Sequence, residues 1–251
     1  MKIIVFNAKK WYPLFSAVKI TAILLLLFIS AGFATRYVLD TELYISAAAD
    51  TGEDKIIILD AGHGGEDCGA VGVSGIYEKT LNLEIVSALA EELTARGYAV
   101  VLTRTDDRLL YSVEENVRGM RKISDLKNRV AVADKYPDAI FLSIHMNSYK
   151  TEKYSGFQAY FNGADTDSRT LAAAIQKNVR ERVQPENGRV IKDGGELYIL
   201  KNAPTVTALL ECGFISNAAE CEKLSQKEYQ KELSFAIVCG IIEYIEQKNL
   251  Q

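Results

Sequence analysis

Short apolar runs alternate with segments of helical spacing along residues 55–248, and this pattern is typical of one α/β domain. Six runs are expected to form strands: KIIILD (55–60), YAVVLTR (98–104), DAIFLSIH (138–145), GFQAYFNG (156–163), LYILK (197–201) and TVTALLE (205–211). Helices are expected over 81–97, 125–136 and 167–183, and from Ser225 onward. Because strands that alternate with helices form largely parallel sheets, we expect a twisted, mostly parallel or mixed sheet with helices on both faces.

The first and last predicted helices carry signals at their ends. The first ends at Gly97, a residue type that favours helix C-terminal caps. In the last, Ser225 and Glu228 match a capping box, in which each side chain bonds the other residue's backbone N–H. Aliphatic residues then recur at helical spacing: Leu233, Ile237, Ile241 and Ile245. The stretch 106–124 is the one long irregular connection, and we expect it to be a loop at the site.

The basic and then apolar N-terminus predicts export. Residues 1–34 carry four lysines and no acidic residue, and residues 20–34 are uncharged and mostly apolar. Read as 14–34, the segment has 21 residues and can span a bilayer if Lys19 reaches the interface. Because the lysines stay cytoplasmic, the rest of the chain is expected across the cytoplasmic membrane, either anchored or cleaved. Residues 35–54 are expected to be a linker to the folded domain at 55–251.

The charge balance excludes one class of partner. The 251 residues include 29 basic and 33 acidic side chains, a net charge of −4. General nucleic-acid binders normally carry a basic surface, so no nucleic-acid partner is expected. A hydrophobic content of 48% with 25% charged residues is that of a folded protein, which excludes wholesale disorder.

The candidate chemistry gathers at predicted strand ends. The sequence has two histidines: His63 follows the first strand, and His145 ends the third. In open α/β sheets, ligands bind beyond the carboxyl ends of strands. Glu78 starts the first helix, and Glu211 ends an apolar strand, where a carboxylate needs a hydrogen bond, an ion pair or a metal. Two histidines and one glutamate can hold zinc and leave a position for water, while a separate carboxylate moves protons.

Other interpretations of these residues stay open on spacing alone. A strand-end histidine is often structural, and Glu78 could simply favour the positive end of the helix dipole. The GHGG segment could bind phosphate, although it lacks the lysine of a P-loop and the spacing of GxGxxG. Cys212 could be a nucleophile, but strand alternation sends it and Glu211 to opposite faces, and a small buried side chain is the simpler interpretation. The pairing of the four cysteines cannot be read from sequence.

Five segments, which follow one another along the chain in the same order as in a known family, favour a metal site. They are IIILDAGHGGEDCGAVG, GIYEKTLNLEIVSALAEEL, VVLTRTDD, DAIFLSIHMNS and LLECGFISN. Together they resemble the zinc-dependent N-acetylmuramoyl-L-alanine amidases, which cut cell-wall peptidoglycan. The resemblance implies that His63, Glu78 and His145 bind Zn²⁺, that Glu211 is the catalytic carboxylate, and that the fold is a twisted, mostly parallel sheet between helices.

Further segments are similar to the germination-specific branch of that family, which acts on spore cortex. They include RKISDLKNRV, YSGFQAYFN and GGELYILKNA. In that branch the amidase strips peptide stems from muramic acid before muramic-δ-lactam forms, which implies a place at the cell wall or in the forespore intermembrane space. No wall-binding repeat occurs in these 251 residues, so targeting is expected to depend on residues 14–34 or on an activating protein partner.

Some assignments remain alternatives. Asn147, two residues past His145, could bind a peptide stem or could merely close the strand. The leading function is the zinc amidase. A different zinc peptidase or deacetylase of the wall, and a non-catalytic wall-binding module, are the two others. The intact set of two histidines and two glutamates argues against the last, because degenerate members usually lose a ligand.

Overall fold

The computed structural model describes residues 55–111 and 119–250. In this part of the chain, six strands form one sheet in the order β2-β1-β3-β6-β4-β5. The strands are β1 (Ile56–Ala61), β2 (Ala99–Leu102), β3 (Ile140–Asn147), β4 (Gln158–Phe161), β5 (Lys192–Asp193) and β6 (Val206–Phe214). Strands β2, β1, β3 and β6 are parallel, and β4 pairs antiparallel with β6. The predicted mixed α/β sheet is therefore confirmed.

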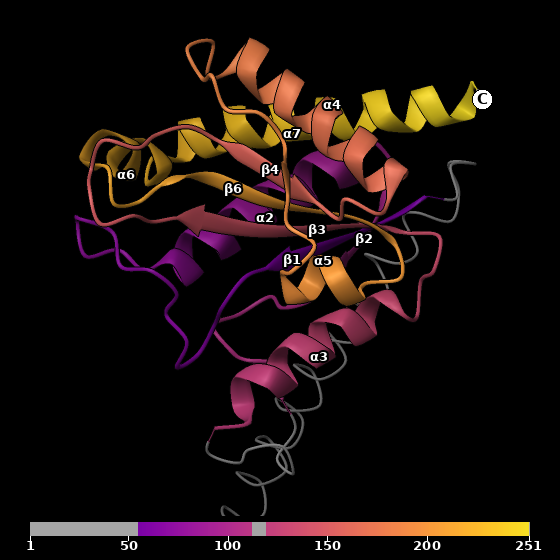
Figure 1. Ribbon diagram of the computed structural model, residues 1–251, viewed down its shortest axis with the longest axis horizontal. Helices are drawn as coiled ribbons and strands as arrows, with labels where there is room; N and C mark the ends of the chain where they lie inside the picture. The colour runs from indigo at the N-terminus through magenta and orange to yellow at the C-terminus, as the bar shows by residue number, and fades with distance from the viewer. Residues whose placement is uncertain (1–54, 112–118, 251) are drawn as a thin grey trace, which may run out of the picture. The chain divides into compact units, whose positions relative to one another are not determined.

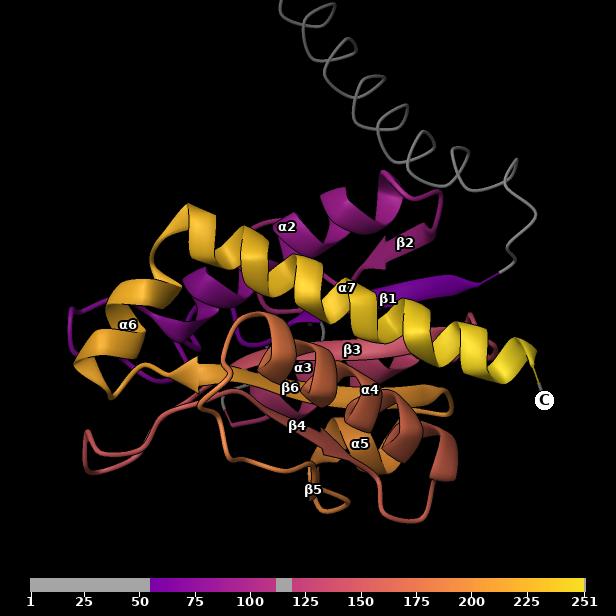
Figure 2. The same ribbon diagram turned by 90° about the horizontal axis from the view of Figure 1, so that it is seen from above.

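Helices cover both faces of this sheet. Figure 1 shows α4 and α7 on one side of the sheet and α3 and α5 on the other, and Figure 2 shows α7 running beside α2 and α4. Their bounds are α2 (Glu78–Thr94), α3 (Arg121–Ala133), α4 (Thr166–Arg182), α5 (Tyr198–Asn202), α6 (Ala218–Leu224) and α7 (Lys227–Asn249). The two-sided covering explains why the central strands β1 and β3 are buried along most of their length.

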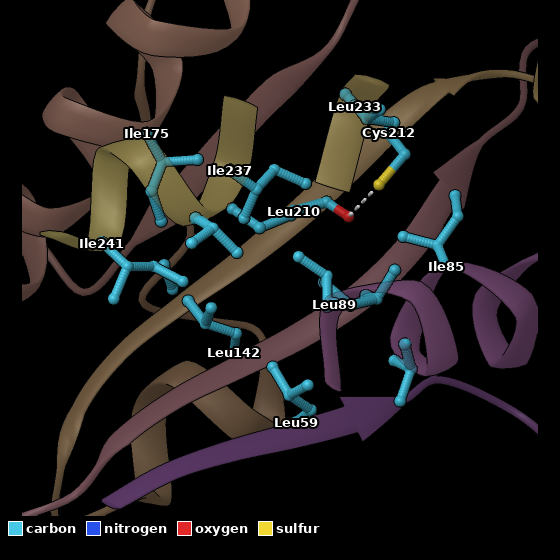
Figure 3. Close-up of a cluster of buried hydrophobic side chains, with 14 of the residues drawn as sticks. Leu59, Ile85, Leu89, Leu142, Ile175, Leu210, Cys212, Leu233, Ile237 and Ile241 are labelled. Atoms are coloured by element: carbon cyan, nitrogen blue, oxygen red, sulfur yellow. Dashed lines mark hydrogen bonds between the residues drawn. The ribbon is translucent and has the colours of Figure 1, made fainter. Parts of the chain in front are cut away.

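Strand alternation divides the central strands between two unlike faces. Leu59, Leu142 and Leu210 are fully or almost fully buried and point toward α2 and α7, where Ile85, Leu89, Leu233, Ile237 and Ile241 pack against the sheet (Figure 3). On the opposite face, a smaller apolar cluster joins the first halves of β1 and β3 to α3 and α5; it contains Ile58, Val130, Ala133, Phe141 and Ile199. Beyond that cluster, toward the carboxyl ends of the strands, this second face becomes polar.

One predicted strand is wrong. Residues 197–201 were expected to extend, but α5 occupies Tyr198–Asn202. Five residues are too few for periodicity to separate a buried strand from a helical turn. As a helix, this segment buries both Ile199 and Leu200, and Ile199 joins the smaller cluster on α3. The place beside β4 is taken by β5 instead.

The predicted helix ends have mixed outcomes. Gly97 has φ +87° and its N–H bonds the carbonyl of Thr94 at 3.0 Å, which confirms the C-terminal cap of α2. The capping box is wrong: α7 begins at Lys227 after Gln226, and Ser225 Oγ instead donates to the carbonyl of Cys221 at 2.7 Å. Ser225 therefore closes α6, a helix that no sequence pattern predicted.

Two further predictions concern segments near or outside the described residues. The predicted irregular connection 106–124 is shorter than expected, because α3 already begins at Arg121, and residues 112–118 lie outside the described part. The signal or anchor at 1–34 and the linker at 35–54 also lie outside it. Among the described residues, no helix combines the length and hydropathy needed to cross a bilayer.

Candidate active site

The parallel strands bring three of the predicted site residues to one edge of the sheet. His63 follows the end of β1, His145 lies near the end of β3, and Glu211 lies on β6. His145 and Glu211 are direct register partners, so their side chains project from the same face. Glu78 comes from a fourth element, as the first residue of α2, which the loop after β1 brings back over this edge. All four predicted residues therefore meet.

The two histidines converge on one carboxylate oxygen. His63 Nε2 lies 3.1 Å and His145 Nδ1 2.9 Å from Glu78 Oε1. The candidate ligand atoms of these three residues all lie within 4.8 Å of one another. The carboxylate itself is held by backbone N–H groups, since Ala70 donates to Oε2 at 2.8 Å and Met146 donates to Oε1 at 3.1 Å. The three side chains are thus oriented toward a shared point.

Two glycines make room for this convergence. A Cβ on Gly62 would lie 2.3 Å from His145 Nε2, and a Cβ on Gly69 would lie 2.5 Å from Glu78 Oε2. Gly69 also has φ +65°, where a larger residue is strained. His63 itself has φ +61°, an uncommon conformation for a side chain with a Cβ. Backbone strain of this kind is concentrated at functional sites, and here it points the His63 ring at Glu78.

The electrostatics of the cluster favour a cation. Burial by itself would raise the pKa of Glu78, but its hydrogen bonds to His145 and His63 hold that pKa well below the usual range. Burial by itself would lower the pKa of His63, but hydrogen bonds to Asp67 and Glu78 raise it to about 9. The buried carboxylate of Glu78 therefore favours a positive charge beside it, which at His63 is a proton on the imidazole.

Glu211 has a different environment. The side chain is partly exposed as a whole, yet its Oε2 is buried and makes no hydrogen bond to any residue of the described chain. Burial raises the pKa of Glu211 to about 7, an effect that the nearby charge of Glu78 reinforces and that His145 and His63 oppose. A carboxylate that titrates near neutral pH can both accept and deliver a proton.

The sequence reading missed Asp67. Its Oδ2 lies 2.9 Å from His63 Nδ1, and its Oδ1 accepts the N–H of Gly69 at 3.2 Å. This contact leaves Nε2 of His63 facing Glu78, as is usual for carboxylates that orient a metal-binding histidine. Spacing gave a weak signal for it, because Asp67 lies only four residues past His63.

Two buried arginines hold the backbone of the His63 loop and were also missed. The carbonyl of Ala61 accepts from Arg104 Nε at 2.8 Å and from Arg129 Nη1 at 2.7 Å. The carbonyl of Gly62 accepts from Arg104 Nη2 at 3.0 Å, and that of His63 accepts from Arg129 Nη2 at 2.8 Å. The three carbonyls before and at the turn are therefore fixed by side chains rather than by water.

Arg129 is neutralised by buried acids. Its Nη1 lies 2.6 Å from Asp60 Oδ1 and its Nε lies 2.7 Å from Asp125 Oδ2. Asp60 also accepts hydrogen bonds from Thr103 and Ser143, both at 2.7 Å. A signal for Asp60 exists in the sequence, because it ends the apolar run KIIILD just as Glu211 ends TVTALLE. Arg129 gave none, since one arginine in an amphipathic helix is normally solvent-facing.

Two weaker candidates have clear positions. Cys212 lies in the core on the face opposite the site, where its thiol points to the carbonyl of Leu210 at 3.8 Å (Figure 3) and burial raises its pKa far above the usual range. The buried-hydrophobe interpretation is confirmed, and all four cysteines are free. Asn147 ends β3 beyond a register shift, with its carbonyl accepting the N–H of Ile215 at 3.0 Å. Its role in binding stays a prediction.

Comparison with known proteins shows the family of this chain. A family model described as N-acetylmuramoyl-L-alanine amidase matches residues 57–243. The chain belongs to this family. It is 32% identical over 195 residues to the germination-specific N-acetylmuramoyl-L-alanine amidase of Bacillus subtilis, covering 78% of this chain and 81% of that protein. The amidase resemblance, and its similarity to the germination-specific branch, are confirmed.

Solved structures of amidases share the fold. The CwlD amidase from Clostridioides difficile, in complex with the GerS lipoprotein, matches with a TM-score of 0.74 and 37% identity over 77% of this chain and 99% of that one. The catalytic domain of the amidase CwlV from Bacillus (Paenibacillus) polymyxa matches with a TM-score of 0.64 and 32% identity over 76% of this chain and 98% of that one. The chain is an N-acetylmuramoyl-L-alanine amidase, a hydrolase of peptidoglycan.

Proposed function

We propose that this amidase is a zinc enzyme in which His63, Glu78 and His145 hold the metal and Glu211 moves the protons. The observation that carries the proposal is the convergence of His63 Nε2 and His145 Nδ1 on Glu78 Oε1, beside the register partner Glu211. Two histidines and a glutamate are a common donor set of hydrolytic zinc sites. The residues present therefore fit the ion in number, type and orientation.

When bound, zinc would supply Lewis-acid polarisation of the scissile carbonyl and a more acidic water. The protein's own residues prepare the rest. Asp67 accepts the Nδ1 proton of His63 and so keeps Nε2 free as a ligand. Arg104 and Arg129 hold the carbonyls of the loop, so that the His63 ring keeps its direction when substrate enters.

Glu211 is suited to proton transfer for two reasons. It lies across from His145 on the next strand, which brings it beside the ligand cluster. Its pKa of about 7, and a buried Oε2 that has no hydrogen-bond partner in the described part of the chain, leave it free to take a proton from water and to give it to the departing amine. In this proposal the amide cleaved is the one between the lactyl group of N-acetylmuramic acid and L-alanine.

We further propose a role in spore cortex, with removal of stems before muramic-δ-lactam forms. Support comes from the 32% identity to the germination-specific amidase of Bacillus subtilis. The CwlD amidase is solved in complex with the GerS lipoprotein, and on this ground our proposal includes an activating protein partner for this chain. Export and anchoring by residues 14–34 remain part of the proposal on sequence grounds alone.

The test is digestion of purified cortex and vegetative peptidoglycan by the full-length chain in detergent, with mass spectrometry of the products. Release of stems with a free L-alanine N-terminus, abolished by a chelator and restored by zinc, is the expected result. Release that persists after the metal is removed would refute the zinc assignment. Acetate or a free D-amino acid as product would instead indicate a deacetylase or a peptidase. Equal action on both polymers would contradict a cortex-specific role.

A further inference from the structure

A cleft separate from the candidate active site lies near the edge of the sheet where the strands end. It has a volume of about 670 Å³ and is lined by three segments: residues 153–156 after β3, residues 183–189 after α4, and residues 217–229 from the start of α6 to the first turn of α7. Figures 1 and 2 both show α6, the end of β6 and the loop after β3 on the same side of the molecule. None of the four residues of the proposed zinc site lines this cleft.

The cleft carries more positive than negative charge, with three cationic side chains against two acidic ones in its lining. Lys153, Arg189 and Lys223 all line it, and none of them forms an ion pair with a carboxylate of the described residues. One of its two acids, Glu220, is already occupied, because its Oε1 accepts the N–H of Gly156 at 2.9 Å and its Oε2 accepts that of Phe214 at 2.8 Å. The other acid, Glu186, is exposed. The charge of Glu220 attracts Arg189 and Lys223, but the three cations outnumber the two acids around this hollow, which suits an anionic ligand.

Arg189 is held in place before any ligand arrives. Its Nε donates to the carbonyl of Ser155 at 2.7 Å, its Nη1 donates to Gln158 Oε1 at 3.0 Å, and its guanidinium lies 4.5 Å from the centre of the Phe214 ring. Its Nη2 makes no hydrogen bond within the described chain. Because the planar fork is fixed by these contacts, little side-chain entropy is lost when a carboxylate bonds the remaining donors.

The contacts of Arg189 connect the cleft to the catalytic edge. Gln158 on β4 is the register partner of Glu211, and Phe214 is three residues beyond Glu211 on β6. Neighbouring strands lie about 4.8 Å apart, and Arg189 bonds the side chain of Gln158 on the strand next to Glu211, so we take the separation of Arg189 from Glu211 as about two strand spacings, on the order of 10 Å. An extended peptide advances about 3.3 Å per residue, so this separation corresponds to about three residues.

From this geometry we propose that the cleft is a subsite for the peptide stem, in which Arg189, assisted by Lys153 and Lys223, binds a stem carboxylate within about three residues of the cleaved amide. The inference rests on the proposed function, because the stem is the product that the proposed hydrolysis detaches. It adds a specificity element: a stem whose nearby carboxylate is amidated would be a poorer ligand. Arg189 acts here in binding, at a distance from the reacting atoms.

Calorimetric titration of the full-length chain in detergent tests the subsite without requiring hydrolysis. The probes are L-alanyl-γ-D-glutamyl-L-lysine with an amidated C-terminus and the same peptide with the glutamyl α-carboxylate amidated as well, so that the two differ in one carboxylate and the acid peptide has no other. The wild-type chain should bind the acid peptide more tightly, and Arg189→Gln should weaken that binding roughly 10- to 100-fold, while changing affinity for the amide less than about twofold. Arg189→Lys should recover part of the loss, since it keeps the charge but not the fork.

Two further variants distinguish peptide binding in the cleft from a folding defect and from non-specific electrostatic attraction of the peptide to the protein. Lys223 is exposed and forms no ion pair or side-chain hydrogen bond within the described residues, so Lys223→Gln should fold normally and weaken only the acid peptide, by about two- to fivefold. Lys135→Gln removes the same charge beyond the far end of α3 and should change neither affinity. Equal binding of both peptides to the wild type, or equal losses in Arg189→Gln, would overturn the proposal.

The outcome is separable from that of the proposed function. A chain that prefers the acid peptide through Arg189, yet needs no zinc to release stems, would refute the zinc assignment and keep the subsite. A chain that releases stems only with zinc but binds both peptides equally would keep the zinc assignment and refute the subsite.

Discussion

The two faces of the central sheet are built from the same strands but differ in polarity at the carboxyl ends of those strands. Toward α2 and α7, residues such as Leu59, Leu142 and Leu210 form an apolar core that excludes water. On the other face, the residues next to them in sequence include Asp60 and Glu211, and here the carboxyl ends of the strands carry charge, hydrogen bonds and the candidate site.

This difference places the residues that stabilise the fold mainly on the apolar face and the residues of the candidate site on the polar face. The apolar face needs no specific partner for any side chain, so it tolerates exchange among aliphatic residues of similar volume. The polar face depends on particular atoms: one carboxylate oxygen contacts two imidazoles, and two arginines together bond three successive carbonyls. Substitutions on the first face should therefore change the free energy of unfolding, and those on the second should change activity, stability or both according to the partner they leave.

The largest effect is expected at Glu211. Glu211→Gln should lower the rate of amide hydrolysis by about 10²- to 10⁴-fold, because the amide cannot carry the proton. Since burial raises the pKa of the glutamate to about 7, the charged form destabilises the fold at neutral pH, and the metal-free variant should melt at a higher temperature than the metal-free wild type. Stem release measures the hydrolysis rate, and calorimetry measures the melting temperature. A slower enzyme that is also less stable would contradict this division between the faces.

Arg129→Met should be the most destabilising change on the polar face. It leaves Asp60 as a buried charge without its partner, which typically costs about 3–5 kcal/mol. Arg121→Met on the same helix is the matched control, because Arg121 pairs with Glu66 at the surface and should change the unfolding free energy little. Urea titration of both variants gives the comparison, and equal midpoints would show that the buried pair does not stabilise the loop.

Leu142→Ala tests the apolar face. The leucine is fully buried between the sheet and the helices, so its truncation should cost about 2–5 kcal/mol through lost burial and the cavity left behind. The rate per folded molecule should stay within about twofold of wild type, since no site residue is touched. Leu250→Ala, at a residue that is 88% exposed, serves as the control in the same denaturation series. A large loss of specific activity in Leu142→Ala would show that the two faces are coupled.

Zinc should stabilise only through the polar face. At a free concentration about 100 times its dissociation constant, the ion should add roughly 2.7 kcal/mol to the unfolding free energy of the wild-type chain. His63→Ala should lose most of this gain, whereas Leu142→Ala should keep it in full. Thermal melts with and without zinc measure the gain, and an equal gain in His63→Ala would place the ion elsewhere.

The smallest effect is the acid dependence conferred by Asp60. Burial by itself would raise its pKa, but Arg129, Ser143 and Thr103 together lower it below the ordinary value of 3.8. The stabilisation is therefore complete above about pH 4 and is lost as the pH falls through the lower folded-state pKa, with a slope of at most about 1.4 kcal/mol per pH unit. Comparison of wild type with Asp60→Asn from pH 5 to pH 2 isolates this slope, and parallel curves would refute it.

The two faces also differ in how much of their structure the sequence predicts. The apolar face follows from periodicity, which correctly assigned α2 and α7 and the positions from Leu233 to Ile245 that they bury. The segment 197–201 was misassigned because one turn of helix and one short strand bury the same two side chains. Ser225 was misassigned because a capping pattern is local, and its hydroxyl found a partner in the preceding helix instead.

The sequence alone determined which residue types this amidase could use: two histidines, two glutamates at element ends, and an alternation that separates Glu211 from Cys212. Only the tertiary structure decided the remainder, because it depends on contacts between residues far apart in the chain. The pairing of Asp60 with Arg129 spans 69 positions and the cleft at Arg189 joins three separate segments. Local pattern carries information about burial and spacing, whereas the partner of a buried charge is set by how the elements pack.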